Sequence, residues 1–124
     1  MSRWVVHSEA EFDAVHALTS YLDTPEEPHS HRWRVAIRVG TDHLHPEGYA
    51  VDFDGVHRLL ADVVAPLDGA DLNHEPEIGL PSPTAERLAV VIAGRLAPSC
   101  DALGARLLTV SVWEGPGNRV DLEL

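Results

Sequence analysis

The sequence predicts an α+β domain in which helices cover one face of an antiparallel sheet. Three observations predict this class. Two N-terminal segments are strand-like, two central segments repeat apolar residues at helical spacing, and two C-terminal segments flank Gly115-Pro116-Gly117. The resulting order is strand, strand, helix, helix, strand, strand, which favours an antiparallel sheet with separate helices over an alternating parallel fold.

The first two strands are expected over residues 3–16 and 29–40. Alternate residues of a strand point the same way, so His29 and His31 share a face with Trp33 and the apolar residues beyond it. The segment from Leu18 to Pro28 is rich in Pro and acidic residues, which predicts a loop. Antiparallel pairing across this loop brings His16 near both later histidines.

Two helices are expected in the middle of the chain. The first contains apolar residues at helical spacing, namely Phe53, Val56, Leu60, Val63, Val64 and Leu67. A long loop follows over residues 68–83. The second helix is expected to begin with Ser82 as N-cap and Pro83 at its first position, and to end by Pro98. Its predicted buried stripe is Leu88, Val91, Ile92 and Leu96.

A closing hairpin is expected from strands at residues 105–114 and 118–124. The chain has 124 residues, which predicts a single domain over residues 1–124. Its formal net charge of -11 disfavours nucleic acid as a partner. Cys100 is the single cysteine, and the sequence contains no signal-peptide core and no apolar run of membrane-spanning length. We therefore expect a cytoplasmic protein that does not bind membranes.

The three histidines of the first two strands form the main candidate site. Imidazoles on an apolar face are either core histidines with satisfied hydrogen bonds or ligands of a metal. Three neutral imidazoles with an open fourth position are typical of catalytic zinc. The second interpretation predicts Zn²⁺ bound by His16, His29 and His31.

Glu114 is a second candidate, because it shares a strand face with the apolar Leu108, Val110 and Val112. One interpretation is a carboxylate that faces water at the end of a strand. The other is an anchor that accepts two N–H groups from a planar ring such as a guanine or a pterin.

These elements together resemble the 6-pyruvoyltetrahydropterin synthase / 6-carboxytetrahydropterin synthase family. The resemblance rests on ordered markers along nearly the whole chain: Phe12-Asp13-Ala14-Val15-His16, His29-Ser30-His31, Tyr49-Ala50-Val51-Asp52-Phe53, Leu67-Asp68, Asp71-Leu72-Asn73, Pro83-Thr84-Ala85-Glu86 and Trp113-Glu114. The usual form of the histidine pair has Gly at the position of Ser30.

The resemblance implies the tunnelling fold, a four-stranded antiparallel sheet with two helices that closes into trimeric barrels, which stack as a homohexamer. It also implies sites between subunits, in which the three histidines hold zinc. Glu114 would bind the pterin ring, and Thr84 and Phe53 would contact the substrate. The implied activity is that of a zinc-dependent lyase acting on dihydroneopterin triphosphate or a related pterin.

The chain departs from the family pattern where protons are transferred. The family's usual base is a cysteine just before the histidine pair, and this loop has none. Asp68 matches the Asp of the family's assisting Asp-His pair, but Gly69 stands where the His belongs. Glu26 or Glu27 lies in the right loop to serve as base.

The absence of the usual cysteine and histidine permits three interpretations. A branch of the family carries Glu in place of the cysteine and cleaves its substrate by a retro-aldol reaction, giving 6-hydroxymethyldihydropterin. Alternatively, the chain catalyses another reaction in which His74 or Asp71 relays protons beside zinc. The third reading is a non-catalytic homologue that binds zinc or a pterin. We expect an enzyme, because structural zinc sites are usually closed and rich in cysteine.

Overall fold

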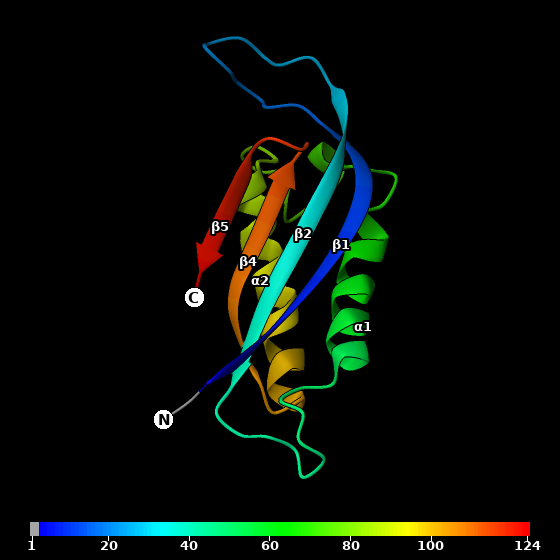
Figure 1. Ribbon diagram of the computed structural model, residues 1–124. Coiled ribbons are helices and arrows are strands. Elements are labelled where there is room, and N and C mark those ends of the chain that lie inside the picture. Colours follow the sequence, from blue (N-terminus) through cyan, green and yellow to red (C-terminus); the bar gives the residue numbers. More distant parts are fainter. Residues whose placement is uncertain (1–2) are drawn as a thin grey trace.

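The computed structural model describes residues 3–124 and contains one sheet with two long helices on one side (Figure 1). Its elements in chain order are β1 (Trp4–His16), β2 (His29–Thr41), α1 (Phe53–Val64), the 3-10 turn η1 (Ala65–Leu67), β3 (Ala70–Asp71), the 3-10 turn η2 (Leu72–His74), α2 (Ala85–Ala102), β4 (Arg106–Glu114) and β5 (Arg119–Glu123). The two long strands, both helices and the closing hairpin confirm the predicted α+β order. No helix within residues 3–124 combines the length and apolar character needed to cross a bilayer.

The sheet has the strand order β3-β1-β2-β4-β5. The long pairs β1–β2, β2–β4 and β4–β5 are antiparallel, as expected. The short β3 adds a fifth strand parallel to β1, opposite Ala14 and Val15, so the sheet is mixed rather than purely antiparallel. Asp13 explains this addition, because its backbone N–H donates to Asp68 and its carbonyl accepts from the N–H of Gly69. These bonds draw part of the predicted long loop alongside the free edge of β1.

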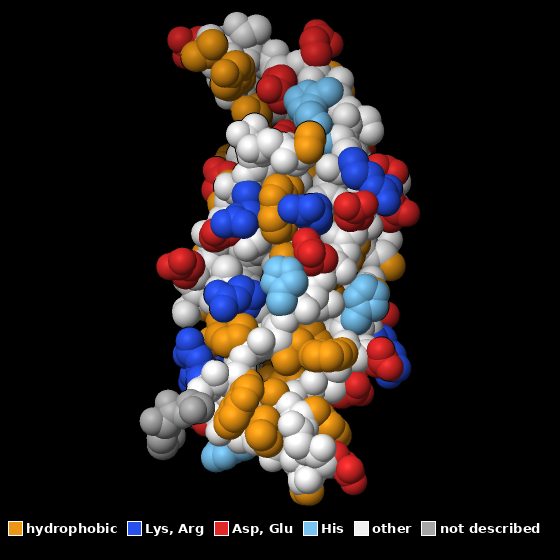
Figure 2. All heavy atoms as spheres, in the orientation of Figure 1, with side chains coloured by type: hydrophobic (Ala, Val, Ile, Leu, Met, Phe, Trp, Pro, Cys, Tyr) orange, Lys and Arg blue, Asp and Glu red, His pale blue; other side chains and the backbone are white. Residues whose placement is uncertain are grey.

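The core lies between the sheet and the helices. Alternate residues of β1, β2 and β4 face it, and the largest fully buried side chains there include Phe12, Trp33 and Ile37. The four residues predicted to form the buried stripe of α2 are all buried, as are Val56 and Leu60 of α1. The opposite face of the sheet is open, and arginine and acidic side chains gather over its middle (Figure 2).

The predicted bounds of the second helix are wrong at both ends. Thr84, not Ser82, is the N-cap, since its Oγ1 accepts from the N–H of Arg87 at 3.0 Å. Ser82 instead accepts from the N–H of Thr19 at 2.8 Å, and this bond fastens the segment before α2 to the loop after β1. At the other end, the helix continues through Pro98 to Ala102. Burial of Cys100 beyond the proline stabilises this last turn despite the missing N–H.

Candidate metal centre

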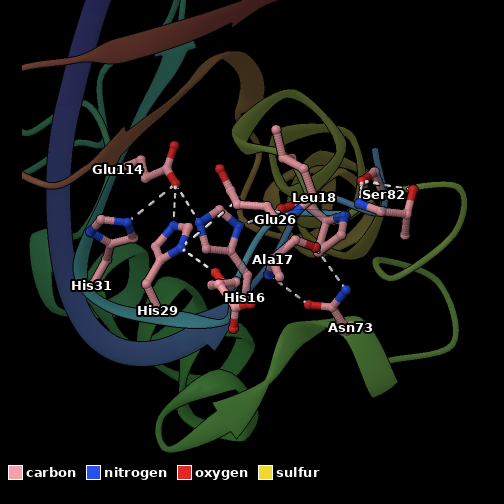
Figure 3. Close-up of polar contacts among 12 residues, drawn as sticks. His16, Ala17, Leu18, Glu26, His29, His31, Asn73, Ser82 and Glu114 are labelled. Carbon is pink, nitrogen blue, oxygen red and sulfur yellow. Dashed lines mark hydrogen bonds and ion pairs between the residues drawn. The ribbon is translucent and has the colours of Figure 1, made fainter. Parts of the chain in front are cut away.

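Three histidines meet at one end of the β1–β2 ladder. His16 is paired with His29, and His31 is opposite Ala14, so the three imidazoles project from neighbouring positions on the same face. Glu114 ends β4 beside this group, opposite Trp33. The four possible ligand atoms all lie within 4.8 Å of one another (Figure 3).

The Nε2 atoms of the histidines converge on a single carboxylate oxygen. Oε1 of Glu114 lies 3.4 Å from Nε2 of His31, 3.7 Å from Nε2 of His29, and in direct contact with Nε2 of His16. The cluster thus offers three nitrogen ligands and one oxygen ligand. Sequence analysis predicted the three histidines as ligands but did not predict that Glu114 would join them.

Backbone carbonyls set the tautomers of two of these imidazoles. Nδ1 of His16 lies 2.8 Å from the carbonyl of Pro83, and Nδ1 of His29 lies 3.0 Å from the carbonyl of Glu27. A carbonyl only accepts hydrogen bonds, so each Nδ1 carries the proton and each Nε2 keeps its lone pair. This is how proteins orient histidines for a metal.

The geometry around His16 fits a cation. This side chain is 1 % exposed, and its Nε2 has no hydrogen-bond partner among the described residues. Its nearest polar neighbour is the carboxylate of Glu114, which is also an acceptor. Two acceptors facing each other in a buried place repel unless a positive charge lies between them. Three neutral imidazoles and a carboxylate are ligands that suit zinc.

The environment of His31 favours its neutral form. Burial lowers the pKa of His31 below the usual histidine value, and the neighbouring His29 and His16 lower it further. The carboxylate of Glu114 opposes this shift without cancelling it. The imidazole of His31 therefore keeps a lone pair available for a metal at neutral pH.

A cavity of about 340 Å³ opens beside the cluster. This volume lies within the range of small-molecule sites. The residues that line it come from the end of β1, the loop before β2, the start of α2 and the end of β4: His16, Leu18, Tyr21, Glu26, Thr84, Ala85, Glu86 and Glu114. A ligand in this cavity can contact His16 and Glu114 at the same time.

The structure separates the two glutamates proposed as a base. Oε1 of Glu26 accepts from the N–H of Leu18 at 3.0 Å and lies 3.7 Å from Nδ1 of His29. Its carboxylate lines the cavity. Glu27 is exposed and contributes its backbone carbonyl to His29. Among the two, only Glu26 places a carboxylate beside the histidines (Figure 3).

Three other predicted site residues lie outside the lining of this cavity. Asp68 accepts from the backbone N–H of Asp13 at 3.0 Å. His74 is hydrogen-bonded to Asp71 at 3.0 Å and is exposed. Phe53 begins α1 with 74 % of its surface exposed, and α1 follows the loop at the Thr41 end of β2, far from His29 (Figure 1).

Several residues that shape the site were not among the site residues predicted from the sequence. Tyr21 and Glu86 line the cavity, and Pro83 supplies the carbonyl that orients His16. Asn73 clamps the residue after His16, because its side chain accepts from the N–H of Ala17 and donates to the carbonyl of the same residue, both at 2.8 Å. Asn73, Pro83 and Glu86 all stand in family markers, and this was the signal that could have identified them.

Comparison with known proteins identifies the family. The sequence profile described as "6-pyruvoyl tetrahydropterin synthase" matches residues 5–123. The chain belongs to the 6-pyruvoyl tetrahydropterin synthase family. By sequence, no curated protein matches it significantly.

Solved structures share the fold of this family member at low sequence identity. The 6-pyruvoyl tetrahydropterin synthase of Caenorhabditis elegans is 17% identical with a TM-score of 0.84, and the alignment covers 100% of this chain and 97% of that one. The Plasmodium falciparum enzyme is 19% identical with a TM-score of 0.78, covering 100% and 99%. A catalytic-residue variant of the Plasmodium vivax enzyme, in which glutamate is replaced by cysteine, is 13% identical with a TM-score of 0.79, covering 100% and 99%.

Proposed function

We propose that this protein is a zinc-dependent lyase that cleaves the side chain of a dihydropterin, with Glu26 as the base. One observation carries the proposal: the carboxylate of Glu26 lines the same cavity as His16 and Glu114. The family supplies the reaction class, and the cluster supplies the metal ligands.

The histidines would hold zinc, and the other residues would bind and orient the substrate. When bound, zinc supplies a Lewis acid that stabilises negative charge on a side-chain oxygen of the substrate. Glu114 contacts the three histidines through Oε1, so its other carboxylate oxygen is available to accept a hydrogen bond from the pterin ring. Thr84 sits at the same cavity wall, at the start of α2.

Glu26 has the position and surroundings of a general base. Its carboxylate is half-buried, and the N–H of Leu18 fixes one of its oxygens. A fixed carboxylate beside the reacting carbon contributes about 10²–10⁴-fold as an acid–base catalyst. The Plasmodium vivax enzyme supports a glutamate in this role, because the residue replaced in its catalytic-residue variant is a glutamate. Retro-aldol cleavage to 6-hydroxymethyldihydropterin is therefore favoured over triphosphate elimination.

Asp68, His74 and Phe53 would contact the substrate only in an oligomer. They lie outside the cavity of their own chain, so they would reach substrate only at the site of a neighbouring subunit in a trimer or hexamer. β5 and most of β1 leave open sheet edges among the described residues, and such edges are suited to pairing with other copies. Light scattering of the zinc-loaded protein tests this assembly, and a monomer would contradict it.

The function is tested with zinc-loaded protein, 7,8-dihydroneopterin and 7,8-dihydroneopterin triphosphate. Mass spectrometry identifies the products of retro-aldol cleavage or of triphosphate elimination. The Glu26→Gln variant is expected to lose at least about a hundredfold in kcat with an unchanged zinc content. Glu27→Gln is the matched control and should keep the wild-type rate.

Two outcomes would contradict the proposal. Equal rates for wild type and Glu26→Gln would exclude Glu26 as the base. Tight binding of both pterins by zinc-loaded protein without any turnover would instead favour a non-catalytic pterin-binding homologue.

A further inference from the structure

We infer that Glu114 is an exchangeable ligand, whose carboxylate binds the metal while the cavity is empty and turns to the pterin ring when substrate enters. The inference rests on the proposed function and adds to it a way of opening the metal centre. It comes from the contacts of one carboxylate, which belongs both to the histidine cluster and to the cavity wall.

The first role of Glu114 follows from the place of its Oε1. This oxygen lies 3.4 Å from Nε2 of His31 and 3.7 Å from Nε2 of His29, and it contacts Nε2 of His16 directly (Figure 3). Because His16 and His29 carry their protons on Nδ1, their Nε2 lone pairs face a carboxylate that also only accepts. A cation among these atoms satisfies all of them, and the carboxylate is then its fourth ligand.

Four ligands from the protein make a closed centre. Zinc in proteins is usually four-coordinate, and closed sites serve structure, whereas catalytic sites keep one position open. The three histidines and Glu114 together offer four ligand atoms. The open position that the proposed reaction needs therefore requires one of these ligands to leave.

Glu114 is the ligand whose side chain is best placed to leave. The imidazoles of His16 and His29 are each fixed by a backbone carbonyl at Nδ1, 2.8 and 3.0 Å away. The ring of His31 packs edge-on against that of His29, with 4.4 Å between centroids. Glu114 is the last residue of β4, and 34 % of its side chain is exposed. Rotation about its side-chain bonds can turn the carboxylate away from the histidines while the backbone stays in the sheet.

The second role of Glu114 follows from its place in the cavity wall. Its side chain lines the cavity of about 340 Å³ together with Thr84 and Glu86 at the start of α2. A pterin ring presents two N–H groups along one edge, and a carboxylate binds such an edge best with both of its oxygens. The substrate ring thus needs the same Oε1 that the metal needs.

The two roles compete for this one oxygen. While Oε1 of Glu114 is on the metal, only the second oxygen is left to accept an N–H of the ring. Turning to the ring adds a second charge-assisted hydrogen bond and leaves three imidazoles around the metal, which is a ligand set typical of catalytic zinc.

The exchange makes recognition of the ring a condition for catalysis. A compound whose ring does not take the carboxylate of Glu114 meets a closed centre, even if its side chain fits the cavity. Glu26 lines the same cavity, so the base and the opened metal position become available to the same ligand. The site would therefore select its substrate by the ring before it acts on the side chain.

The test uses 6-methyl-7,8-dihydropterin, a probe whose side chain offers the metal no oxygen. Titration against a chromophoric chelator measures the zinc affinity with and without this probe. We expect the saturating probe to lower the zinc affinity of the wild-type protein by about tenfold, and zinc to lower the affinity for the probe by the same factor, because coupling between two ligands is reciprocal.

Two variants show whether Glu114 carries this coupling. Glu114→Gln should lower the zinc affinity by about tenfold without the probe, since a charged ligand is lost, and should abolish the coupling. Glu27→Gln is the matched control, because it removes one charge beside the same cluster. Glu27 gives His29 only its backbone carbonyl, so this variant should keep the wild-type zinc affinity and coupling.

Cobalt in place of zinc reports the exchange without reference to affinity. The visible absorption bands of Co²⁺ depend on the number and kind of its ligands. The probe should change these bands in the cobalt-loaded wild-type protein. It should leave them unchanged in cobalt-loaded Glu114→Gln at a concentration that saturates the variant.

Several results would overturn the inference. These are a zinc affinity that is equal with and without the probe, a wild-type cobalt spectrum that the probe does not alter, and an equal spectral change in Glu114→Gln. Failure of the probe to bind would also overturn it, because the exchange requires a ring that takes the carboxylate.

Turnover of 7,8-dihydroneopterin separates this inference from the proposed function. Turnover without ligand exchange would leave the lyase and remove only the inference. Ligand exchange without turnover would support the inference and contradict the lyase.

Discussion

The chain contains two His-x-His segments, and only one belongs to the candidate metal centre. His29-Ser30-His31 begins β2, whereas His43-Leu44-His45 lies in the loop after the same strand. The two segments have identical spacing and are separated by the length of one strand. They end up at opposite ends of the β1–β2 ladder, where their imidazoles have opposite roles.

The difference lies in which nitrogen is free. Nδ1 of His29 donates to a carbonyl, which leaves Nε2 as an acceptor directed at Glu114. Nδ1 of His45 instead accepts from the backbone N–H of Glu47 at 3.1 Å, so the proton is on Nε2. The ring of His45 stacks on Tyr49 with 4.4 Å between centroids. Two features therefore distinguish the first segment from the second. The neighbouring strand β1 supplies a third imidazole, that of His16, and a backbone carbonyl binds Nδ1 of His29.

The largest effect should come from replacing one histidine by alanine at each end of the β1–β2 ladder. His29→Ala removes a ligand and is expected to lower zinc affinity by at least about a thousandfold, since the loss of even an outer-shell partner costs 10–100-fold. His43→Ala should leave about one zinc per chain. Elemental analysis after dialysis and titration against a chromophoric chelator measure both values.

Two results would break the comparison. Equal zinc content in His29→Ala and wild type would exclude the cluster as the site. A loss of zinc in His43→Ala would show that the loop segment takes part.

Acidification should release the metal from the cluster. Zinc competes with protons for the imidazoles, so we expect the zinc affinity to fall by roughly a hundredfold between pH 7 and pH 5.

Burial lowers the pKa of His31, which means that the folded chain resists protonation more than the unfolded chain does. The metal-free protein should therefore keep this contribution to stability above about pH 6.5 and lose it as the pH falls toward the lowered pKa. Chelator titrations and thermal melts of the metal-free protein over this range test both signs, and a flat profile would contradict them.

Much of the fold was predictable because it depends on alternation and periodicity. The apolar pattern around Trp33 and Ile37 gave β2, and the spacing of Leu88 and Ile92 gave the buried face of α2. β3 was missed because two residues carry no pattern, and it is held by backbone bonds to Asp13. The N-cap was misplaced because Ser82 and Thr84 are both capping residues, and the contact of Ser82 with Thr19 is tertiary.

The clustering of the three histidines was predictable, whereas the contacts that orient them were not. Strand pairing implied that His16 meets His29 and His31. The choice between Glu26 and Glu27 depends on backbone bonds to Leu18, which no local pattern encodes.

Asn73 should matter to both stability and metal binding. Its side chain makes two bonds of 2.8 Å to the backbone of Ala17, next to His16, whereas the hydroxyl of Thr41 makes longer bonds to the backbone of His43, at 3.2 and 3.3 Å. Asn73→Ala leaves two polar groups of a buried residue unpaired, so we expect a loss of about 2 kcal/mol in unfolding free energy and about tenfold in zinc affinity. Asn118→Ala, in the exposed turn after β4, is the control. Denaturant unfolding and chelator titration measure these effects, and a stability loss without weaker zinc binding would separate Asn73 from the positioning of His16.

The smallest effect should come from two hydroxyls that have similar local roles at the two ends. Thr84 caps α2 and thereby fixes the preceding carbonyl of Pro83, which orients His16. Thr41 accepts from the backbone N–H of His43 at 3.2 Å.

Thr84→Ala should cost about 1 kcal/mol of unfolding free energy, as loss of an N-cap does, and weaken zinc binding about threefold. Thr41→Ala should cost less than about 0.5 kcal/mol, since the hydrogen bond that it removes is exposed to solvent, and leave zinc binding unchanged. Thermal melts in the presence and absence of zinc distinguish the two variants. If both lose stability but neither changes zinc affinity, the carbonyl of Pro83 does not control the metal centre, and the tautomer of His16 must be fixed by the metal itself.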